Sequence, residues 1–370
     1  MSFFSLPSFA GGAPGEEDDD DDVSRLFTIS DIHVDDASNM HWLESLPARP
    51  RDSLILAGDV SDRLELVERA FVAAKAKYDK VFFTFGNHDV WLREGEQGTS
   101  LDKIEAVFEV AKKTGVETGV CTLGKKRKCV VAPLQSFYHA SFDTEDAITR
   151  WRGIPSAKLV MTDFRRCRWP KELAENDELL AKTVDERNDG IEAEIMKMKE
   201  ENVDVITFSH FLPRIELLPE KRYLFLPTLM EAVGSRFLGE RVKRIKPDLH
   251  IFGHTHINWD MTIDGTRYIQ AALAYPNEWR TRPASLAIGQ LASADDRQPL
   301  LVWDSKQGIV KHDYPTRWSD HYKAYPRVPE LTHVLPPYTA RLYKPLPGSA
   351  VKDVKDHVKP KKQKEQYLRS

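Results

Sequence analysis

The sequence is poor in cysteine, and this excludes several kinds of protein. Its 370 residues include three cysteines, Cys121, Cys129 and Cys167, which are odd in number and form no Cys-x-x-Cys pair. A disulfide scaffold or a zinc knuckle is therefore not expected. Unpaired thiols are typical of reducing compartments. We predict a cytoplasmic protein, and a nuclear one only if the basic run at 125–128 is a localisation signal and not a solvated turn.

Long apolar runs are also missing from the sequence. A membrane-spanning helix needs about 18 or more consecutive apolar residues, and no such stretch is present. Residues 1–14 lack the basic start and the apolar run of a secretory signal. We therefore expect neither a membrane span nor secretion.

The sequence has no excess of positive charge. It contains 53 Lys and Arg against 57 Asp and Glu, for a formal net charge of −4. The charges are uneven, because residues 16–22 are seven consecutive acids, whereas residues 351–370 hold seven basic and three acidic side chains. These ends offset each other in part and leave a nearly neutral body, which gives no strong signal for nucleic-acid binding. Protein partners are not indicated by any motif.

The apolar pattern predicts an α/β protein, since 41% of the residues are hydrophobic and apolar runs alternate with helical patterns. Two amphipathic helices are expected at 64–79 and 101–112, and a hairpin at 116–133. One long helix is expected to end at residue 202, and the proline-rich stretch 315–347 is expected to be extended. The predicted strands are 26–30, 53–57, 80–85, 204–209, 248–252, 267–271 and 299–304.

This pattern also predicts how the chain is divided. We expect a disordered acidic tail at 1–23, a catalytic domain at 24–310 with an insertion or cap at 134–202, a proline-rich extended segment at 311–350, and a mobile basic tail at 351–370.

Five of the predicted strands are followed by side chains that can bind a metal ion. In chain order these side chains are Asp31 and His33, then Asp59, then Asn87, then His210, and finally His254 and His256. Loops beyond the carboxyl ends of strands converge on one crevice in an open α/β sheet, so these distant residues can meet. Asp31 and His33 are two residues apart, which places both side chains on one face of an extended segment. Glycines precede Asp59, Asn87 and His254, and they are expected to permit tight turns.

The residue types indicate which metals would bind. Carboxylate, imidazole and amide groups without a thiolate suit hydrolytic Mn, Fe, Zn or Mg. Seven protein ligands are too many for one ion, and one bridging carboxylate between two ions accounts for the number. Two ions about 3.5–4 Å apart can hold both the attacking and the leaving oxygen of a phosphoryl group. Each motif alone has an ordinary structural explanation, such as a turn-capping Asp or a buried His, but the ordered set of five does not.

The segments DIH, GDVSDR, GNHD, the strand-borne His210 and GHTH resemble the signature of the calcineurin-like metallophosphoesterase superfamily. The resemblance extends over most of the chain, and the inserted segment is similar to that of plant and algal members. It implies two mixed β-sheets packed face to face and flanked by helices, an α/β/β/α sandwich. It also implies that one metal ion is bound by Asp31, His33 and His256, a second by Asn87, His210 and His254, and that Asp59 bridges them.

The resemblance further implies roles in catalysis. His88 would assist the leaving group, Asp62 would orient His88, and Arg63 would hold phosphate, although a surface salt bridge is an alternative for Arg63. Asp89 would lie behind the ligands or begin a helix. Val34 and Asp89 replace the Gly and Glu of the protein-phosphatase branch, which argues against a phosphoprotein phosphatase.

Aromatic and basic residues of the insertion are candidates for substrate binding. Tyr138, His139 and Arg166 would line the cleft, although an aromatic cluster is also typical of a core. The leading hypothesis is a hydrolase of phosphate esters, with phosphomonoesters favoured, in which a hydroxide held between two metal ions attacks phosphorus. A phosphodiesterase acting on cyclic nucleotides or other diesters is the alternative. An inactive metal-binding scaffold is the second alternative.

Overall fold

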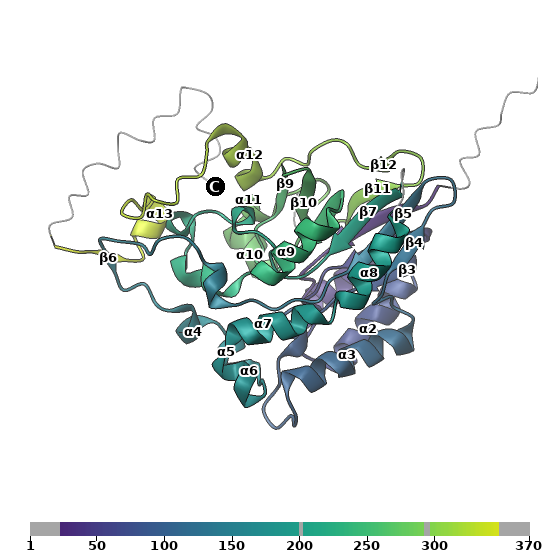
Figure 1. The fold of residues 1–370 in the computed structure, drawn as a ribbon, viewed down its shortest axis with the longest axis horizontal. Helices are drawn as coiled ribbons and strands as arrows, with labels where there is room; N and C mark the ends of the chain where they lie inside the picture. Colours follow the sequence, from purple (N-terminus) through teal and green to yellow (C-terminus); the bar gives the residue numbers. More distant parts are fainter. Residues whose placement is uncertain (1–22, 200–202, 292–296, 348–370) are drawn as a thin grey trace, which may run out of the picture.

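The molecule is built around two large β-sheets. The computed structural model describes residues 23–199, 203–291 and 297–347. It is an α/β fold in which two mixed sheets are flanked by helices (Figure 1). The prediction of the fold class is confirmed. The predicted tails at 1–23 and 351–370 lie outside the described residues, apart from Val23.

The first sheet has the strand order β12-β11-β1-β2-β3. Its β1, β2 and β3 run parallel, and β11 is antiparallel to β1. Parallel strands buried on both faces have continuous apolar sequences, as in β1 and the second half of β2. The bounds are Arg25–Ile29 for β1, Arg49–Leu56 for β2, Tyr78–Phe83 for β3, Leu300–Asp304 for β11 and Gly308–Ile309 for β12.

The second sheet has the order β4-β5-β7-β8-β10-β9. Its four central strands are parallel, and both edge strands are antiparallel. A separate two-stranded sheet pairs β6 (Trp151–Arg152) with β13 (Lys344–Pro345). The bounds are Cys121–Leu123 for β4, Lys128–Pro133 for β5, Val203–Phe208 for β7, Leu249–Phe252 for β8, Trp259–Ile263 for β9 and Thr266–Gln270 for β10.

The core divides along the faces of the second sheet. On β5 and β7, Val131 and Ile206 pack into the cluster that contains the first sheet, whereas Val130 and Val205 pack into a second cluster with α8 and α9. This alternation follows from the two-residue period of a strand. The two sheets therefore share one apolar interior, and helices cover their outer faces.

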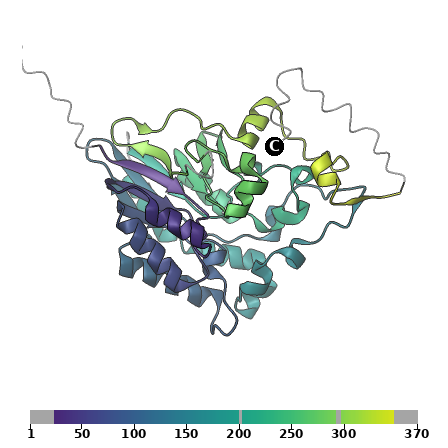
Figure 2. The same cartoon turned by 180° about the vertical axis from the view of Figure 1, so that it is seen from behind.

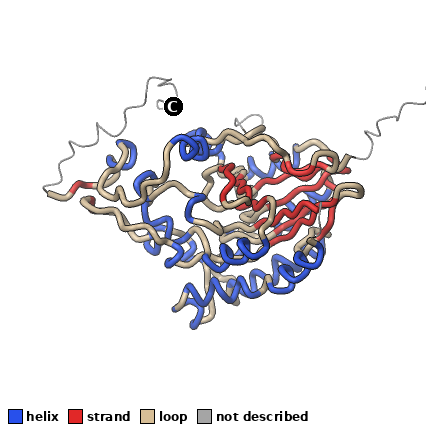
Figure 3. The backbone as a smooth tube through the Cα atoms, turned by 45° about the horizontal axis from the view of Figure 1, so that its top comes forward, coloured by secondary structure: helices blue, strands red, loops and turns tan. Residues whose placement is uncertain are grey.

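Helices α1 (Ala37–Ser45), α2 (Leu64–Lys75) and α3 (Ser100–Thr114) belong to the half of the molecule that holds the first sheet (Figure 2). The outer face of the second sheet is covered by α8 (Asp189–Met198) and α9 (Arg236–Ile245). The strands gather at one end of the molecule, and loops with short helices occupy the other end (Figure 3).

The remaining helices have between four and ten residues. They are α4 at Ala157–Val160, α5 at Asp163–Arg166, α6 at Lys171–Glu175, α7 at Asp177–Glu186, α10 at Pro276–Thr281, α11 at Pro283–Leu286, α12 at Arg317–Ala324 and α13 at Pro337–Ala340. Shorter 3-10 turns occupy His88–Val90, Ala140–Phe142, Ile215–Leu217, Lys221–Tyr223 and Pro227–Ala232. No helix among the described residues is both long and apolar enough to cross a membrane.

Two expectations about local structure are wrong. The long helix before residue 202 is two helices, α7 and α8, because the buried Asn188 between them bonds the backbone of Gln135 with both ends of its amide. The proline-rich stretch is not extended throughout, because it contains α12. The Thr316 side chain caps this helix, and Trp318 on the helix is buried.

Candidate metal centre

The parallel strands of the first sheet place five polar side chains at their carboxyl ends. Asp31 and His33 follow β1, Asp59 follows β2, and Asn87 and His88 follow β3. The loops after β1 and β2 run side by side, since the His33 N–H donates to the Asp59 carbonyl at 3.0 Å. The first sheet thus supplies both predicted carboxylate ligands.

The second sheet supplies the remaining histidines. His210 follows β7, and His254 and His256 follow β8. The two loops are linked to each other, because the Gly253 N–H donates to the His210 carbonyl at 2.9 Å. They are also linked to the first sheet, because the Asp31 carboxylate accepts the His254 N–H at 3.0 Å. All seven predicted ligands are therefore brought to one place.

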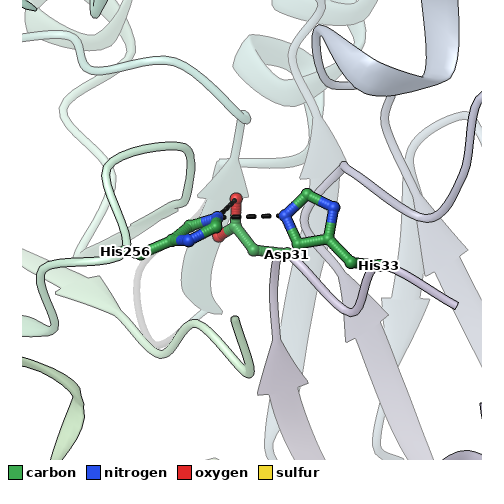
Figure 4. Close-up of side chains that lie close together, drawn as sticks. All are labelled: Asp31, His33 and His256. Carbon is green, nitrogen blue, oxygen red and sulfur yellow. Dashed lines mark hydrogen bonds and ion pairs between the residues drawn. The ribbon is translucent and has the colours of Figure 1, made fainter. Parts of the chain in front are cut away.

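The ligand atoms form two groups. In the first ligand group, His33 Nε2 lies 3.0 Å from His256 Nε2, which lies 3.3 Å from Asp31 Oδ1 (Figure 4). These three side chains form a possible metal-binding triad. The second ligand group is described by the amide oxygen of Asn87, which lies 3.1 Å from His210 Nε2 and 2.9 Å from His254 Nδ1.

Asp59 lies between the two groups. Its Oδ2 is 3.5 Å from His210 Nε2 in the second group and 3.9 Å from His33 Nε2 in the first group. Its other oxygen accepts the His88 N–H at 2.9 Å. The side chain is almost wholly buried, and it is placed where a bridging carboxylate would be.

The hydrogen bonds of the imidazoles show that the centre suits cations. His210 Nδ1 lies 2.9 Å from the Ala57 carbonyl, His254 Nε2 lies 2.8 Å from the Ala232 carbonyl, and His256 Nδ1 lies 2.5 Å from Glu278 Oε2. Each of these outer nitrogens must donate to its oxygen, so in a neutral ring the inner nitrogen carries a lone pair. Lone pairs and carboxylates converge, which is the arrangement that metal ions require.

The pKa values of two histidines also show that the centre favours positive charge. Burial lowers the pKa of His210, but the carboxylates of Asp59 and Asp31 outweigh it and raise the pKa to about 9. Burial is likewise outweighed at His256, whose pKa is raised to about 10 by Asp31 and Glu278. Burial dominates at His254 and lowers its pKa to about 3.

The backbone at the ligands is strained. Nine non-glycine residues of the described chain have a positive φ, and five of them are predicted ligands, with φ between 38° and 77°. Such conformations are unfavourable for residues with a Cβ and persist only where the surrounding structure enforces them. The prediction that Asp31 and His33 lie on an extended segment is wrong, because both are left-handed. The five strained ligands are Asp31, His33, Asp59, His254 and His256.

The three glycines before the ligands serve close packing more than turning. Only Gly58 of the three has a positive φ, at 84°. A Cβ on Gly86 would lie 2.1 Å from Asp59 Oδ1, and a Cβ on Gly253 would lie 2.9 Å from Asp31 Oδ2. These positions need glycine because a carboxylate occupies the space of a side chain.

Asp89 supports the loops from behind. Its carboxylate accepts the backbone N–H groups of Asp59, Val60, Ser61 and Gly86 at 2.8–3.0 Å. Burial and the negative charge of Asp59 raise the pKa of Asp89 to about 7. Asp89 therefore joins the loops after β2 and β3, and it does not begin the next helix, α3, which Thr99 caps.

His88 is held beside the two groups. Its Nε2 lies 3.8 Å from Asp59 Oδ2, and its ring stacks on Trp91 with the centroids 3.6 Å apart. The side chain is 19% exposed, so it can reach a bound molecule. Burial lowers the pKa of His88, although Asp59 opposes this shift.

The other predicted site residues are placed differently. Asp62 lies 3.9 Å from Arg93, and Arg63 lies 3.8 Å from Glu65, so these contacts do not involve His88. Arg166 is half-buried on α5.

Tyr138 and His139, which belong to the predicted insertion, also differ from each other. Tyr138 is buried and stacks toward His254 with a centroid distance of 6.3 Å. The ring of His139 is engaged elsewhere, because it accepts the Arg236 N–H at 3.0 Å and contacts Ser141 at 2.9 Å. These contacts give His139 a structural role at the start of α9.

Three residues of the centre were not predicted from the sequence: Asp163, Trp91 and Glu278. Asp163 Oδ1 accepts hydrogen bonds from Asn87 Nδ2 at 2.9 Å and from Trp91 Nε1 at 2.8 Å. Burial raises the pKa of Asp163 to about 6. One signal in the sequence points to it, because Asp163 is the sole acid among seven basic residues in 150–171. No comparable signal marks Trp91 or Glu278.

Comparison with known proteins agrees with this geometry. Residues 24–258 match the model of the calcineurin-like phosphoesterases. This chain belongs to that family. It is accordingly a metal-dependent hydrolase of phosphate esters.

Two comparisons concern a protein of Mycobacterium tuberculosis. The chain is 26% identical over 271 residues to its [acyl-carrier-protein] phosphodiesterase PptH. The aligned residues cover 70% of this chain and 80% of the relative. The crystal structure of phosphopantetheinyl hydrolase PptH superposes with a TM-score of 0.56 at 22% identity, over 72% of this chain and 95% of that chain. This second likeness shows the shared fold.

Proposed function

We propose that this chain hydrolyses phosphodiesters with two metal ions bound between the ends of its two sheets. The observation that carries the proposal is the convergence of inner imidazole nitrogens and carboxylates, with each outer nitrogen of His210, His254 and His256 bonded to an oxygen. Asp31, His33 and His256 would hold one ion, Asn87, His210 and His254 the other, and Asp59 both. Mn, Fe, Zn or Mg suit these oxygen and nitrogen ligands.

The ions would supply Lewis-acid chemistry by drawing charge from the phosphoryl oxygens and by lowering the pKa of water. The chain itself would supply a proton. His88 stands beside Asp59 with its ring partly exposed, and we propose that its imidazolium protonates the departing oxygen. Arg63, whose side chain is 36% exposed, is proposed to contact a phosphoryl oxygen. Asp62 is proposed to keep Arg93 in place, not to orient His88.

The preference for a diester differs from the sequence-based hypothesis of a monoesterase. It is supported by the relative, which is named a phosphodiesterase. The preference is tested by comparing kcat/KM for a bis-aryl phosphate and for an aryl phosphate, with Asp59→Asn as the inactive control. A higher value for the monoester in the wild-type protein would overturn the diesterase proposal and would restore the monoesterase hypothesis.

The relative also points to a particular test substrate. Because it is named for the acyl carrier protein and for a phosphopantetheinyl group, we propose a carrier-protein diester as the first natural substrate to examine. Mass spectrometry of the carrier protein would detect removal of the group. An unchanged mass, with hydrolysis of bis-aryl phosphate in the same sample, would exclude this substrate but not diesterase activity.

We propose a cytoplasmic location because all three cysteines are free thiols. Microscopy of the tagged full chain would test this. Fluorescence confined to the nucleus would favour the alternative, in which the basic run at 125–128 directs import.

A further inference from the structure

Asp163 is a buried acid that the inserted segment carries into the metal centre. It begins the short helix α5, its exposed fraction is 2%, and it is the sole acid of the segment 150–171, which also contains seven basic residues. It does not cap its own helix, and its carboxylate instead accepts hydrogen bonds from Asn87 and Trp91. A buried carboxylate that contacts two residues of another loop calls for an explanation beyond local structure.

The bond to Asn87 determines which end of the amide faces the histidines. Asn87 Nδ2 donates to Asp163, so Asn87 Oδ1 is turned toward His210 Nε2 at 3.1 Å and His254 Nδ1 at 2.9 Å. An amide has a donor end and an acceptor end, and only the oxygen can bind a metal ion. Without Asp163, nothing in this contact would prevent the amide from turning its nitrogen inward.

The bond to Trp91 acts on a second residue of the centre. Trp91 Nε1 donates to the same Asp163 oxygen at 2.8 Å, which fixes the rotation of the indole. The His88 ring stacks on this indole at a centroid distance of 3.6 Å and an interplanar angle of 29°. The orientation of His88 therefore depends on Asp163 through the Trp91 side chain.

We propose that Asp163 is a positioning residue of the phosphoesterase centre. One carboxylate oxygen presents Asn87 as an oxygen ligand and, through Trp91, holds the ring of His88 toward the leaving group. The inserted segment thereby completes the active site. This inference rests on the roles given to Asn87 and His88 in the proposed function.

The first experiment measures metal binding, using calorimetric titration of Mn²⁺ into chelator-treated protein. For Asp163→Ala we expect the affinity of one of the two ions to fall about 10–100-fold, the usual effect of removing a residue that orients a ligand. Trp91→Phe keeps the stacked ring and loses only the N–H, so both affinities should remain those of the wild type. Arg165→Ala, an exposed neighbour on α5, is the matched control and should also bind as the wild type does.

The second experiment measures kcat on aryl phosphodiesters whose leaving groups differ in pKa. Because a misplaced His88 impairs protonation, Asp163→Ala and Trp91→Phe should lose more turnover on poor leaving groups than on nitrophenolate. Asp163→Asn keeps an acceptor oxygen and should recover most of the loss. This conservative variant also serves if Asp163→Ala fails to fold.

Two results would overturn the inference: wild-type affinity for both ions in the alanine variant, or a loss of turnover that is the same for every leaving group. The second result would assign Asp163 a structural role alone. Failure of the proposed function has a different signature, since Asp59→Asn would then be as active as the wild type.

Discussion

The two ligand groups of the centre are held in different ways. In the first, the outer nitrogen of His256 is bonded to the Glu278 carboxylate, and His33 stacks on Tyr275 at a centroid distance of 4.2 Å. His33 Nδ1 has no hydrogen-bond partner among the described residues. In the second, the outer nitrogens of His210 and His254 are bonded to backbone carbonyls. The first group therefore depends on side chains and their charges, and the second on the path of the backbone.

Because of this difference, the two proposed metal sites should respond to different changes. A carboxylate behind a histidine makes the ring a stronger ligand, whereas a carbonyl only orients it. Side-chain substitutions should separate the two sites, and changes at Asp59 should affect both. The predictions below follow this logic, from the largest effect to the smallest.

Replacing Asp59 by Asn should impair both ligand groups, because Asp59 lies between them. The amide keeps the size of the side chain but loses the negative charge that faces His33 and His210. We expect turnover of a bis-aryl phosphate to fall about 10³-fold or more. Retention of wild-type turnover in a folded, purified Asp59→Asn protein would refute the assigned centre.

Replacing Gly86 by Ala should displace the same carboxylate without changing a ligand. The added Cβ would lie 2.1 Å from Asp59 Oδ1, so Asp59 must move. A displacement of about 1 Å can lower turnover about 10²-fold. Gly190→Ala is the control, because nothing lies within 4 Å of its Cβ position. Equal activities in the two variants would show that Asp59 tolerates displacement.

Replacing Glu278 by Gln should affect the first group alone. The amide oxygen can still accept from His256 Nδ1, but the charge that raises the basicity of the ring is lost. We expect the affinity of one metal ion to fall about 10-fold, with the other unchanged, in calorimetric titrations. Equal weakening at both sites would contradict the separation of the two groups.

A buried histidine outside both groups should govern part of the acid sensitivity. His250 lies between Thr207 and Ser209, and burial lowers its pKa to about 3. Because the unfolded chain takes up this proton near pH 6.5, the stabilising contribution is present above that pH and is lost as the pH falls toward 3.

The measurement is urea unfolding at pH 7 and pH 5. The free energy of unfolding of the wild type should decrease by about 2 kcal/mol more than that of His250→Gln over this interval. Identical decreases would show that the ligand histidines, and not His250, dominate the acid response.

Much of the centre could be predicted from the sequence, because parallel strands must deliver their loops to one edge. That rule was sufficient to bring His210 and His254 to Asp31, although more than 170 residues separate them. It could not find Asp163 or Glu278, whose partners are set by how the insertion and α10 fold back on the sheets. The composition of 150–171 marks Asp163 as unusual but does not identify its partners, and no local pattern marks Glu278.

Two incorrect predictions of local structure have the same cause. Helical periodicity continues through Asn188, but a tertiary contact with Gln135 bends the chain there. The spacing of Asp31 and His33 suggested an extended backbone, and the loops after β1 and β2 impose a left-handed one. In each case, interactions with distant residues override a local preference.

The left-handed backbone at Asp31, His33, Asp59, His254 and His256 has a consequence for evolution. Glycine adopts this backbone conformation with less strain than other residues, so the residues proposed to bind the metal ions are ones that weaken the fold. Selection for thermal stability alone would therefore favour substitution by glycine at these positions first. A more stable but inactive descendant would carry glycine where its ancestor had carboxylate and imidazole side chains.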